Sequence, residues 1–338
     1  MTFFPTLAPH SSRPMPSFQH LLLKQLLTAA AAPLARRKPS VGAMRLAMEA
    51  GSLFQFMPWR VHLESLRLDG RLDAEWLRPR NAHPTRVLLY LHGGGYVLGS
   101  LNTHRSLVGS LAQRCGLNVL TINYRKAPDH PFPAALNDAR RAYRWLRRQG
   151  HAAPDIVVAG DSAGGGLALS LLLALRDAGE ALPAAAVGLS PWTDLNLPIT
   201  ALRRVAREEA LLLEALQMRT WGPLYAHKTP LVHPLLSPAQ ADLHGLPPLL
   251  IQVSTAEVLY DDVVKFVKKA RTAGVVVTLQ PVEGLVHWWH LFWRLVPEAR
   301  QALDQVAGFL DQLWAPAAAA NPALPARAAR PVARRRAA

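Results

Sequence analysis

One serine in this sequence stands where it could act as a nucleophile. Ser162 is the middle residue of positions 160–164 (GDSAG), a G-x-S-x-G pattern. A β-branched apolar run at 156–159 precedes it, and an apolar, helix-forming run at 165–175 follows it. A tight strand-to-helix turn would expose the serine hydroxyl and aim a helix N-terminus at developing negative charge. The short pattern alone is also compatible with an ordinary β–α turn.

A glycine-rich motif lies roughly 70 residues upstream. Residues 87–91 (VLLYL) read as a buried strand, and residues 92–96 (HGGGY) follow at once. Glycines after a strand leave backbone N–H groups uncovered, and the oxyanion of an acyl-transfer intermediate needs such preorganised donors. We expect the N–H groups of Gly94, Gly95 and Ala163 to form this oxyanion hole. A lone glycine run is also typical of a flexible turn, but its spacing from the serine motif favours the catalytic interpretation.

The sequence resembles the hormone-sensitive-lipase-like branch of the α/β-hydrolase superfamily, the bacterial esterases with an H-G-G-G motif. The resemblance extends from about residue 59 to about residue 313. The matching stretches, in order, are 88–100 (LLYLHGGGYVLGS), 123–136 (NYRKAPDHPFPAAL), 158–165 (VAGDSAGG), 189–195 (LSPWTDL), 245–251 (GLPPLLI) and 256–262 (AEVLYDD). It implies an α/β-hydrolase fold, with a mostly parallel eight-stranded sheet, helices on both faces and a helical cap. It also implies a serine esterase that needs no cofactor.

The resemblance implies which carboxylate assists the serine. The family pattern acid-x-Leu-x-Asp fits residues 257–261 (EVLYD), which makes Glu257 the expected triad acid, where many relatives carry aspartate. Asp261 and Asp262 remain alternatives. Asp261 stands where the next helix should begin, so helix capping explains it better.

His287 is the expected catalytic base. It follows the last expected strand, at 275–282, as the chain order Ser…acid…His of the family requires. His290 is the rival, and the H-x-x-H spacing is compatible with a metal site. Since no third ligand accompanies the pair, we expect no metal and a structural His290. Nearby tryptophans would pack around His290 or line the substrate pocket: Trp288, Trp289 and Trp293.

Alternation of strands and helices predicts a sheet covered on both faces. A hairpin with Asp-Gly at its turn is expected over 59–79. Further strands are expected at 87–91, 117–124, 156–159, 184–190, 249–254 and 275–282, and helices at 106–115, 134–149, 165–175 and 297–313.

The domain plan has three parts. Residues 59–314 form the catalytic domain, with a cap insertion at about 195–245 that contains a helical run at 208–218. A plain surface insertion is the alternative, although the connection is long for a crossover. Residues 1–58 are expected to hold a disordered lead, at 1–16, and cap helices, and residues 315–338 a disordered Ala/Pro/Arg-rich tail.

Residues 21–34 are apolar but too short to span a bilayer, so we expect a cap helix there and no stable membrane insertion. A signal peptide is the alternative, with a broken apolar core. The single cysteine, Cys115, excludes an internal disulfide framework and fits a reducing, cytoplasmic location.

The net charge of +15 raises the question of an anionic partner. Five arginines fall on one expected helix: Arg140, Arg141, Arg144, Arg147 and Arg148. No nucleic-acid motif accompanies them, so a solvated basic surface is expected and nucleic acid is not. The oligomeric state is open, with a homodimer as one alternative.

The resemblance implies hydrolysis of short- to medium-chain carboxylic esters by Ser162, His287 and Glu257 through an acyl-enzyme. An amide, carbamate or lactone hydrolase with the same triad is an alternative. A non-catalytic ligand-binding protein of the same fold is a third hypothesis, but the presence of His287 weighs against it.

Overall fold

The computed structural model describes residues 15–37, 39–53, 55–197 and 209–315. The predicted disordered lead at 1–16 lies outside these ranges except for its last two residues. The predicted disordered tail at 315–338 lies outside them except for Ala315.

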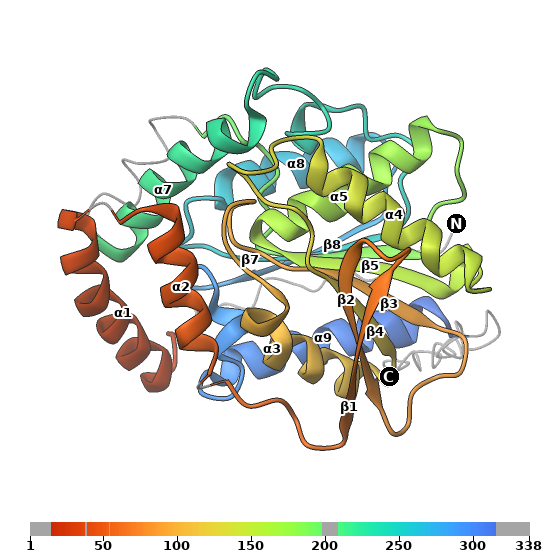
Figure 1. Ribbon diagram of the computed structural model, residues 1–338, viewed down its shortest axis with the longest axis horizontal. Coiled ribbons are helices and arrows are strands. Elements are labelled where there is room, and N and C mark those ends of the chain that lie inside the picture. The colour runs from red at the N-terminus through yellow and green to blue at the C-terminus, as the bar shows by residue number, and fades with distance from the viewer. Residues whose placement is uncertain (1–14, 38, 54, 198–208, 316–338) are drawn as a thin grey trace, which may run out of the picture.

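An eight-stranded sheet forms the centre of the molecule, in the order β1-β2-β4-β3-β5-β6-β7-β8 (Figure 1). The strands are β1 (Val61–Leu68), β2 (Leu72–Pro79), β3 (Val87–Leu91), β4 (Asn118–Ile122), β5 (Ile156–Asp161), β6 (Ala185–Leu189), β7 (Leu249–Ser254) and β8 (Val277–Val282). β2 runs antiparallel to both β1 and β4, and the other neighbouring strands pair in parallel. The expected hairpin and the mostly parallel α/β-hydrolase sheet are therefore confirmed.

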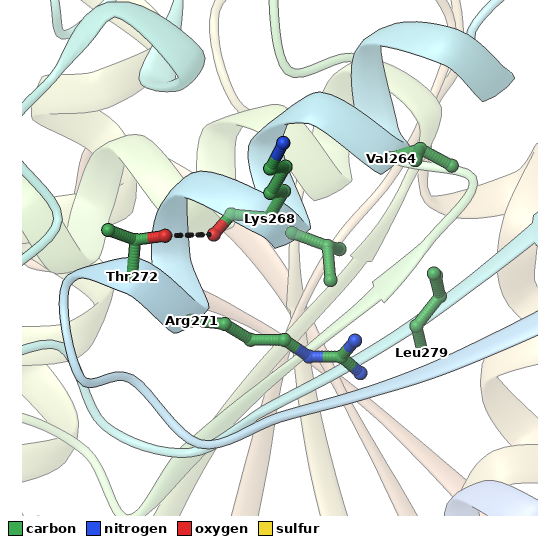
Figure 2. A pocket seen from close by; sticks show the side chains of 6 residues that line it. Val264, Lys268, Arg271, Thr272 and Leu279 are labelled. Atoms are coloured by element: carbon green, nitrogen blue, oxygen red, sulfur yellow. Dashed lines mark hydrogen bonds between the residues drawn. The ribbon is translucent and has the colours of Figure 1, made fainter.

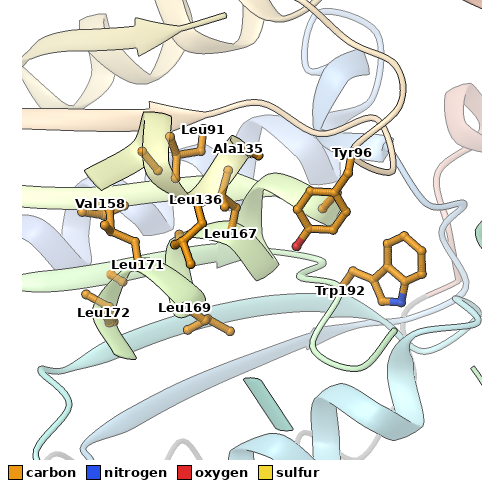
Figure 3. Close-up of a cluster of buried hydrophobic side chains, with 14 of the residues drawn as sticks. Leu91, Tyr96, Ala135, Leu136, Val158, Leu167, Leu169, Leu171, Leu172 and Trp192 are labelled. Carbon is orange, nitrogen blue, oxygen red and sulfur yellow. The ribbon is translucent and has the colours of Figure 1, made fainter. Parts of the chain in front are cut away.

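Helices cover both faces of the sheet, so the strands β3, β5, β6 and β7 are buried along their whole length. The helices of the sheet layers are α3 (Leu101–Cys115), α4 (Ala134–Arg148), α5 (Ser162–Asp177), α8 (Tyr260–Thr272) and α9 (Pro297–Leu313). The buried apolar side chains of α4, α5 and α8 belong mainly to one cluster, and those of α3 share a second cluster with Leu303, Val306 and Leu310 of α9. In Figure 3, Leu91 and Val158 from the strands pack against Leu167 and Leu171 of α5.

Two helix starts differ from the sequence prediction. α3 begins at Leu101 rather than at 106, because Ser100 caps it. The Ser100 Oγ accepts from Thr103 N at 3.3 Å, and the Thr103 Oγ1 accepts from Ser100 N at 2.9 Å. This reciprocal capping box fixes the first turn. α5 begins at Ser162 itself rather than at 165, so the serine lies on the first turn of the helix.

Three further helices gather at one end of the molecule (Figure 1). They are α1 (Phe18–Arg37), α2 (Val41–Ser52) and α7 (Glu209–Ala226). α1 packs against α7, and α2 packs against α3. α7 continues beyond the expected end at 218, with Pro223 inside it, so that prediction was too short. Among the described residues, no helix combines the length and apolarity needed to cross a bilayer.

The arginines of α4 are largely engaged in ion pairs. Arg140 and Arg144 bind Glu180, at 3.1 and 2.7 Å. Arg141 and Arg148 bind Asp69, at 3.5 and 2.9 Å. These pairs are partly exposed and contribute little to stability each, but they neutralise part of the local charge.

Candidate active site

Ser162 occupies the turn between β5 and α5, and its backbone has φ +50°. This left-handed conformation is uncommon for a residue with a side chain and persists only where the surroundings enforce it. A Cβ on Gly160 would overlap the backbone of Gly164, and a Cβ on Gly164 would overlap the carbonyl of Leu91. Close packing of β3, β5 and α5 therefore requires glycine on both sides of the serine.

Ser162, His287 and Glu257 form a chain of hydrogen bonds. The Ser162 hydroxyl lies 2.8 Å from His287 Nε2, and His287 Nδ1 lies 2.7 Å from Glu257 Oε2. All three side chains are buried. A nucleophile bonded to a base, and a base bonded to an orienting carboxylate, is the arrangement that activates a hydroxyl for attack on a carbonyl.

The rival carboxylates have other positions. Asp262 binds Lys265 Nζ at 3.1 Å. Asp261 lies in the first turn of α8, but the residue at the N-cap is Leu259. The capping explanation for Asp261 is therefore wrong. A carboxylate in the first turn is still favoured there by the helix dipole.

Glu257 is held by two further donors that the sequence analysis missed. Its Oε1 accepts from the Ser190 hydroxyl at 2.7 Å and from the Ser254 backbone N–H at 2.9 Å. Ser190 follows β6 and has φ +49°, and Ser254 ends β7. The only signal in the sequence was that Ser190 lies inside the matching stretch 189–195. These two contacts hold the Glu257 carboxylate in a fixed position beside His287.

The glycine loop lies beside the serine because β3 and β5 are neighbouring parallel strands, with Leu91 opposite Gly160. Their carboxyl ends meet at the same edge of the sheet. Gly94 has φ +117° and Gly95 φ +63°, conformations that favour glycine. A Cβ on Gly95 would overlap the ring of Trp221 from α7. The three expected oxyanion donors thus come from this loop (Gly94, Gly95) and from the first turn of α5 (Ala163).

Asp161 ties the serine turn to the glycine loop. Its Oδ1 accepts from the Tyr90 hydroxyl at 2.8 Å and from Gly93 N at 2.9 Å, and His104 Nε2 donates to its Oδ2 at 3.3 Å. Burial opposes ionisation, but the contacts with His104 and Tyr90 outweigh it and lower the pKa of Asp161 to about 2. No motif in the sequence indicates this network, because its members come from separate elements.

His290, the rival of His287, is buried. Its Nε2–H donates to Gln252 Oε1 at 3.0 Å, and its ring centroid lies 3.7 Å from that of Trp289. Burial lowers the pKa of His290 to about 3, so the ring is neutral. Trp289 is also fully buried, whereas Trp288 is partly exposed. This supports a packing role for His290 and Trp289.

Two other features do not provide comparable chemistry. A groove between α8 and β8 is lined by Val264, Val267, Lys268, Arg271, Thr272 and Leu279 (Figure 2). Its Arg271 side chain donates to the Val277 carbonyl at 2.9 Å, and Ser162 is not part of its lining. Burial raises the pKa of the Cys115 thiol to about 12, which disfavours the thiolate that a nucleophile would need. Among the described residues, no cluster of His, Cys, Asp and Glu could hold a metal ion.

Comparison with known proteins gives a consistent result. A family model described as "alpha/beta hydrolase fold" matches residues 88–291. An acetyl-hydrolase of Streptomyces hygroscopicus is 47% identical over 242 residues, covering 71% of this chain and 80% of that protein. An esterase of Acinetobacter venetianus is 38% identical, covering 75% and 83%. A crystal structure of an esterase from the bacterial hormone-sensitive lipase family is 36% identical with a TM-score of 0.82, covering 89% of this chain and 99% of that one.

Proposed function

The chain belongs to the hormone-sensitive-lipase-like branch of the α/β-hydrolase family, and from this premise we propose that it hydrolyses short- to medium-chain carboxylic esters with Ser162, His287 and Glu257. It is a carboxylic ester hydrolase, as its relatives are. The observation that carries the catalytic proposal is the buried hydrogen-bond chain from Ser162 through His287 to Glu257.

The proposed mechanism has two stages, acylation of Ser162 and hydrolysis of the acyl-enzyme. His287 Nε2 accepts the proton of Ser162 as its hydroxyl attacks the ester carbonyl, and then donates that proton to the leaving alkoxide. Glu257 accepts from His287 Nδ1–H, which selects the productive tautomer and stabilises the imidazolium. The N–H groups of Gly94, Gly95 and Ala163 bind the oxyanion. Water activated by His287 then releases the acid from the acyl-enzyme.

Two observations favour the short end of the acyl range. The Trp221 ring lies against Gly95, so the cap helix crowds the loop that would bind the carbonyl oxygen. One of the similar proteins is named as an acetyl-hydrolase. Hydrolysis of amides, carbamates or lactones would use the same residues and remains an alternative. Comparing turnover of an ester with that of the matching amide, carbamate or lactone distinguishes these activities.

The remaining parts of the proposal concern partners and location. We keep the prediction of a small-molecule ester as the partner, with no nucleic acid and with a homodimer as one alternative. A cytoplasmic location also stays a prediction from the cysteine content. The helices α1 and α2 and the insertion with α7 are proposed to form the cap.

Ester hydrolysis by the wild type and by Ser162→Ala tests the proposal. We expect the wild type to hydrolyse p-nitrophenyl esters of short acyl chains, and Ser162→Ala to lose about 10⁶-fold in kcat. Gly164 and the fold are untouched by this substitution, so circular dichroism should not change. A folded wild type without turnover on any chain length would refute the proposed function.

A further inference from the structure

The backbone N–H just before His287 donates a hydrogen bond to a residue from a distant part of the chain. His20, on the first turns of α1, accepts from the Val286 backbone N–H through its Nε2 at 3.0 Å. Val286 is the residue immediately before His287. His20 is fully buried, although α1 is otherwise a peripheral helix. Because Nε2 accepts here, it carries no proton, and His20 is the neutral tautomer protonated at Nδ1.

Several contacts dock α1 onto the same loop. Leu23 of α1 belongs to a buried cluster with Leu285, Trp289 and Val296. The Ser17 backbone N–H and hydroxyl donate to the two oxygens of the Glu298 carboxylate, at 2.6 and 2.8 Å. α1 is therefore anchored on both sides of the catalytic histidine.

The loop that carries His287 needs such external support. Trp288, the next residue, has φ +49°, and Gly284 has φ +73°. A left-handed backbone at a tryptophan is unfavourable and persists only if neighbouring contacts enforce it. On the side of the sheet, the Ser254 hydroxyl donates to Leu285 O and accepts from Leu285 N, both at 2.8 Å. Val286 is the next residue, and its N–H donates to His20.

We propose that His20 is a positioning residue for His287, and that α1 thereby fixes the catalytic histidine loop in its working geometry. The inference rests on the proposed function, in which His287 is the base. His20 acts indirectly, through the backbone. Without an acceptor for the Val286 N–H, the backbone that leads into His287 loses one of the contacts that determine its position. His287 Nε2 would then spend less time at hydrogen-bond distance from Ser162, and misplacement of this order slows catalysis strongly.

The test compares two substitutions at one position in the full-length chain. His20→Leu keeps an apolar side chain in the buried site but removes the acceptor. His20→Gln places an amide oxygen near the position of Nε2 and retains an acceptor. Gln19→Leu is the matched control. It also introduces a leucine, but at the neighbouring position, whose side chain is exposed.

For His20→Leu we expect a kcat about tenfold lower on p-nitrophenyl acetate with KM almost unchanged, and faster hydrogen exchange at the Val286 amide. His20→Gln should restore most of kcat and of the exchange protection, and Gln19→Leu should match the wild type. An unchanged kcat and unchanged Val286 exchange in His20→Leu would overturn the inference. Equal losses in His20→Leu and His20→Gln, each with a lower Tm, would mean that His20 only packs, and would overturn it too.

The outcomes separate this inference from the proposed function. An active wild type that is indifferent to His20→Leu refutes the positioning role alone. A folded wild type without ester turnover refutes the proposed function and the catalytic part of this inference together. The exchange rate at Val286 then still decides whether His20 holds the loop.

Discussion

At the scale of single residues, the site depends on a carboxylate with little freedom to move. Glu257 Oε2 accepts from His287, while Oε1 accepts from Ser190 and from the Ser254 backbone. Glutamate has one methylene more than aspartate, and the two donors on Oε1 hold this longer side chain in place. The orientation of the His287 imidazole therefore depends on residues at the ends of β6 and β7 and on the loop after β8.

Glu257→Gln should lower kcat by about 10⁴-fold, because the amide can present a donor to His287 Nδ1 and stabilise the wrong tautomer. Steady-state kinetics on p-nitrophenyl acetate measures this. Asp261→Asn is the matched control and should stay within about twofold of the wild type, a surface-type effect. A large loss in Asp261→Asn with little in Glu257→Gln would assign the acid to Asp261 instead.

Residues that lie in short ordered motifs can be predicted from the sequence, whereas residues that act through tertiary contacts cannot. Ser162 and the glycine loop stand in local patterns whose backbone requirements are visible in the sequence. Ser190, His104 and His20 do not, since each matters only through a partner on another element. The hydrogen bond of His20 spans 266 positions in the chain, and no local pattern encodes such a contact.

At the scale of elements, α7 packs against the glycine loop. Its Trp221 lies against Gly95, and its Tyr225 stacks on Tyr96 with ring centroids 3.9 Å apart. The helical run was predicted from the sequence, but its length was not. The predicted run ended at 218, whereas the helix continues through Pro223 to Ala226. Burial of the aromatic side chains of α7 offsets the local cost of a proline within the helix.

Trp221→Leu should shift the acyl-chain preference toward longer esters. A smaller side chain beside Gly95 opens space next to the proposed oxyanion loop, and each methylene accommodated is worth about 10-fold or more in kcat/KM. The measurement is the ratio of kcat/KM for p-nitrophenyl hexanoate over acetate. Trp59→Leu, at an exposed position, is the control and should leave this ratio unchanged. An unaltered ratio in Trp221→Leu would show that α7 does not limit the acyl site.

At the scale of the whole molecule, stability is linked to buried neutral histidines. Burial lowers the pKa of His290 to about 3 and also holds the pKa of His92 well below its usual value. Below a pH of about 6.5 the unfolded chain binds protons at these histidines that the native state does not. Stability therefore falls as the pH decreases through this range, by about 1.4 kcal/mol per pH unit for each such histidine.

Urea unfolding at pH 7 and pH 5 checks this expectation. The wild type should be less stable at pH 5, and His290→Gln should show a smaller loss, because glutamine keeps a donor for Gln252 but does not titrate. Asp161 also makes the protein less stable as the pH falls, but only at lower pH. Its depressed pKa contributes stability that is lost as the pH falls from about 3.8 toward about 2. Equal stability of the wild type at pH 7 and pH 5 would contradict the assignment of these histidines as neutral.

The central claim is that Ser162, activated by His287, is the covalent nucleophile, and one labelling experiment tests it directly. The protein is treated with a fluorophosphonate that reacts with activated serines, digested, and analysed by mass spectrometry. The account predicts a single modified serine, Ser162, in the wild type, with loss of the label in Ser162→Ala and strongly slowed labelling in His287→Ala. Labelling at another residue, or ester turnover that survives in Ser162→Ala, would contradict it.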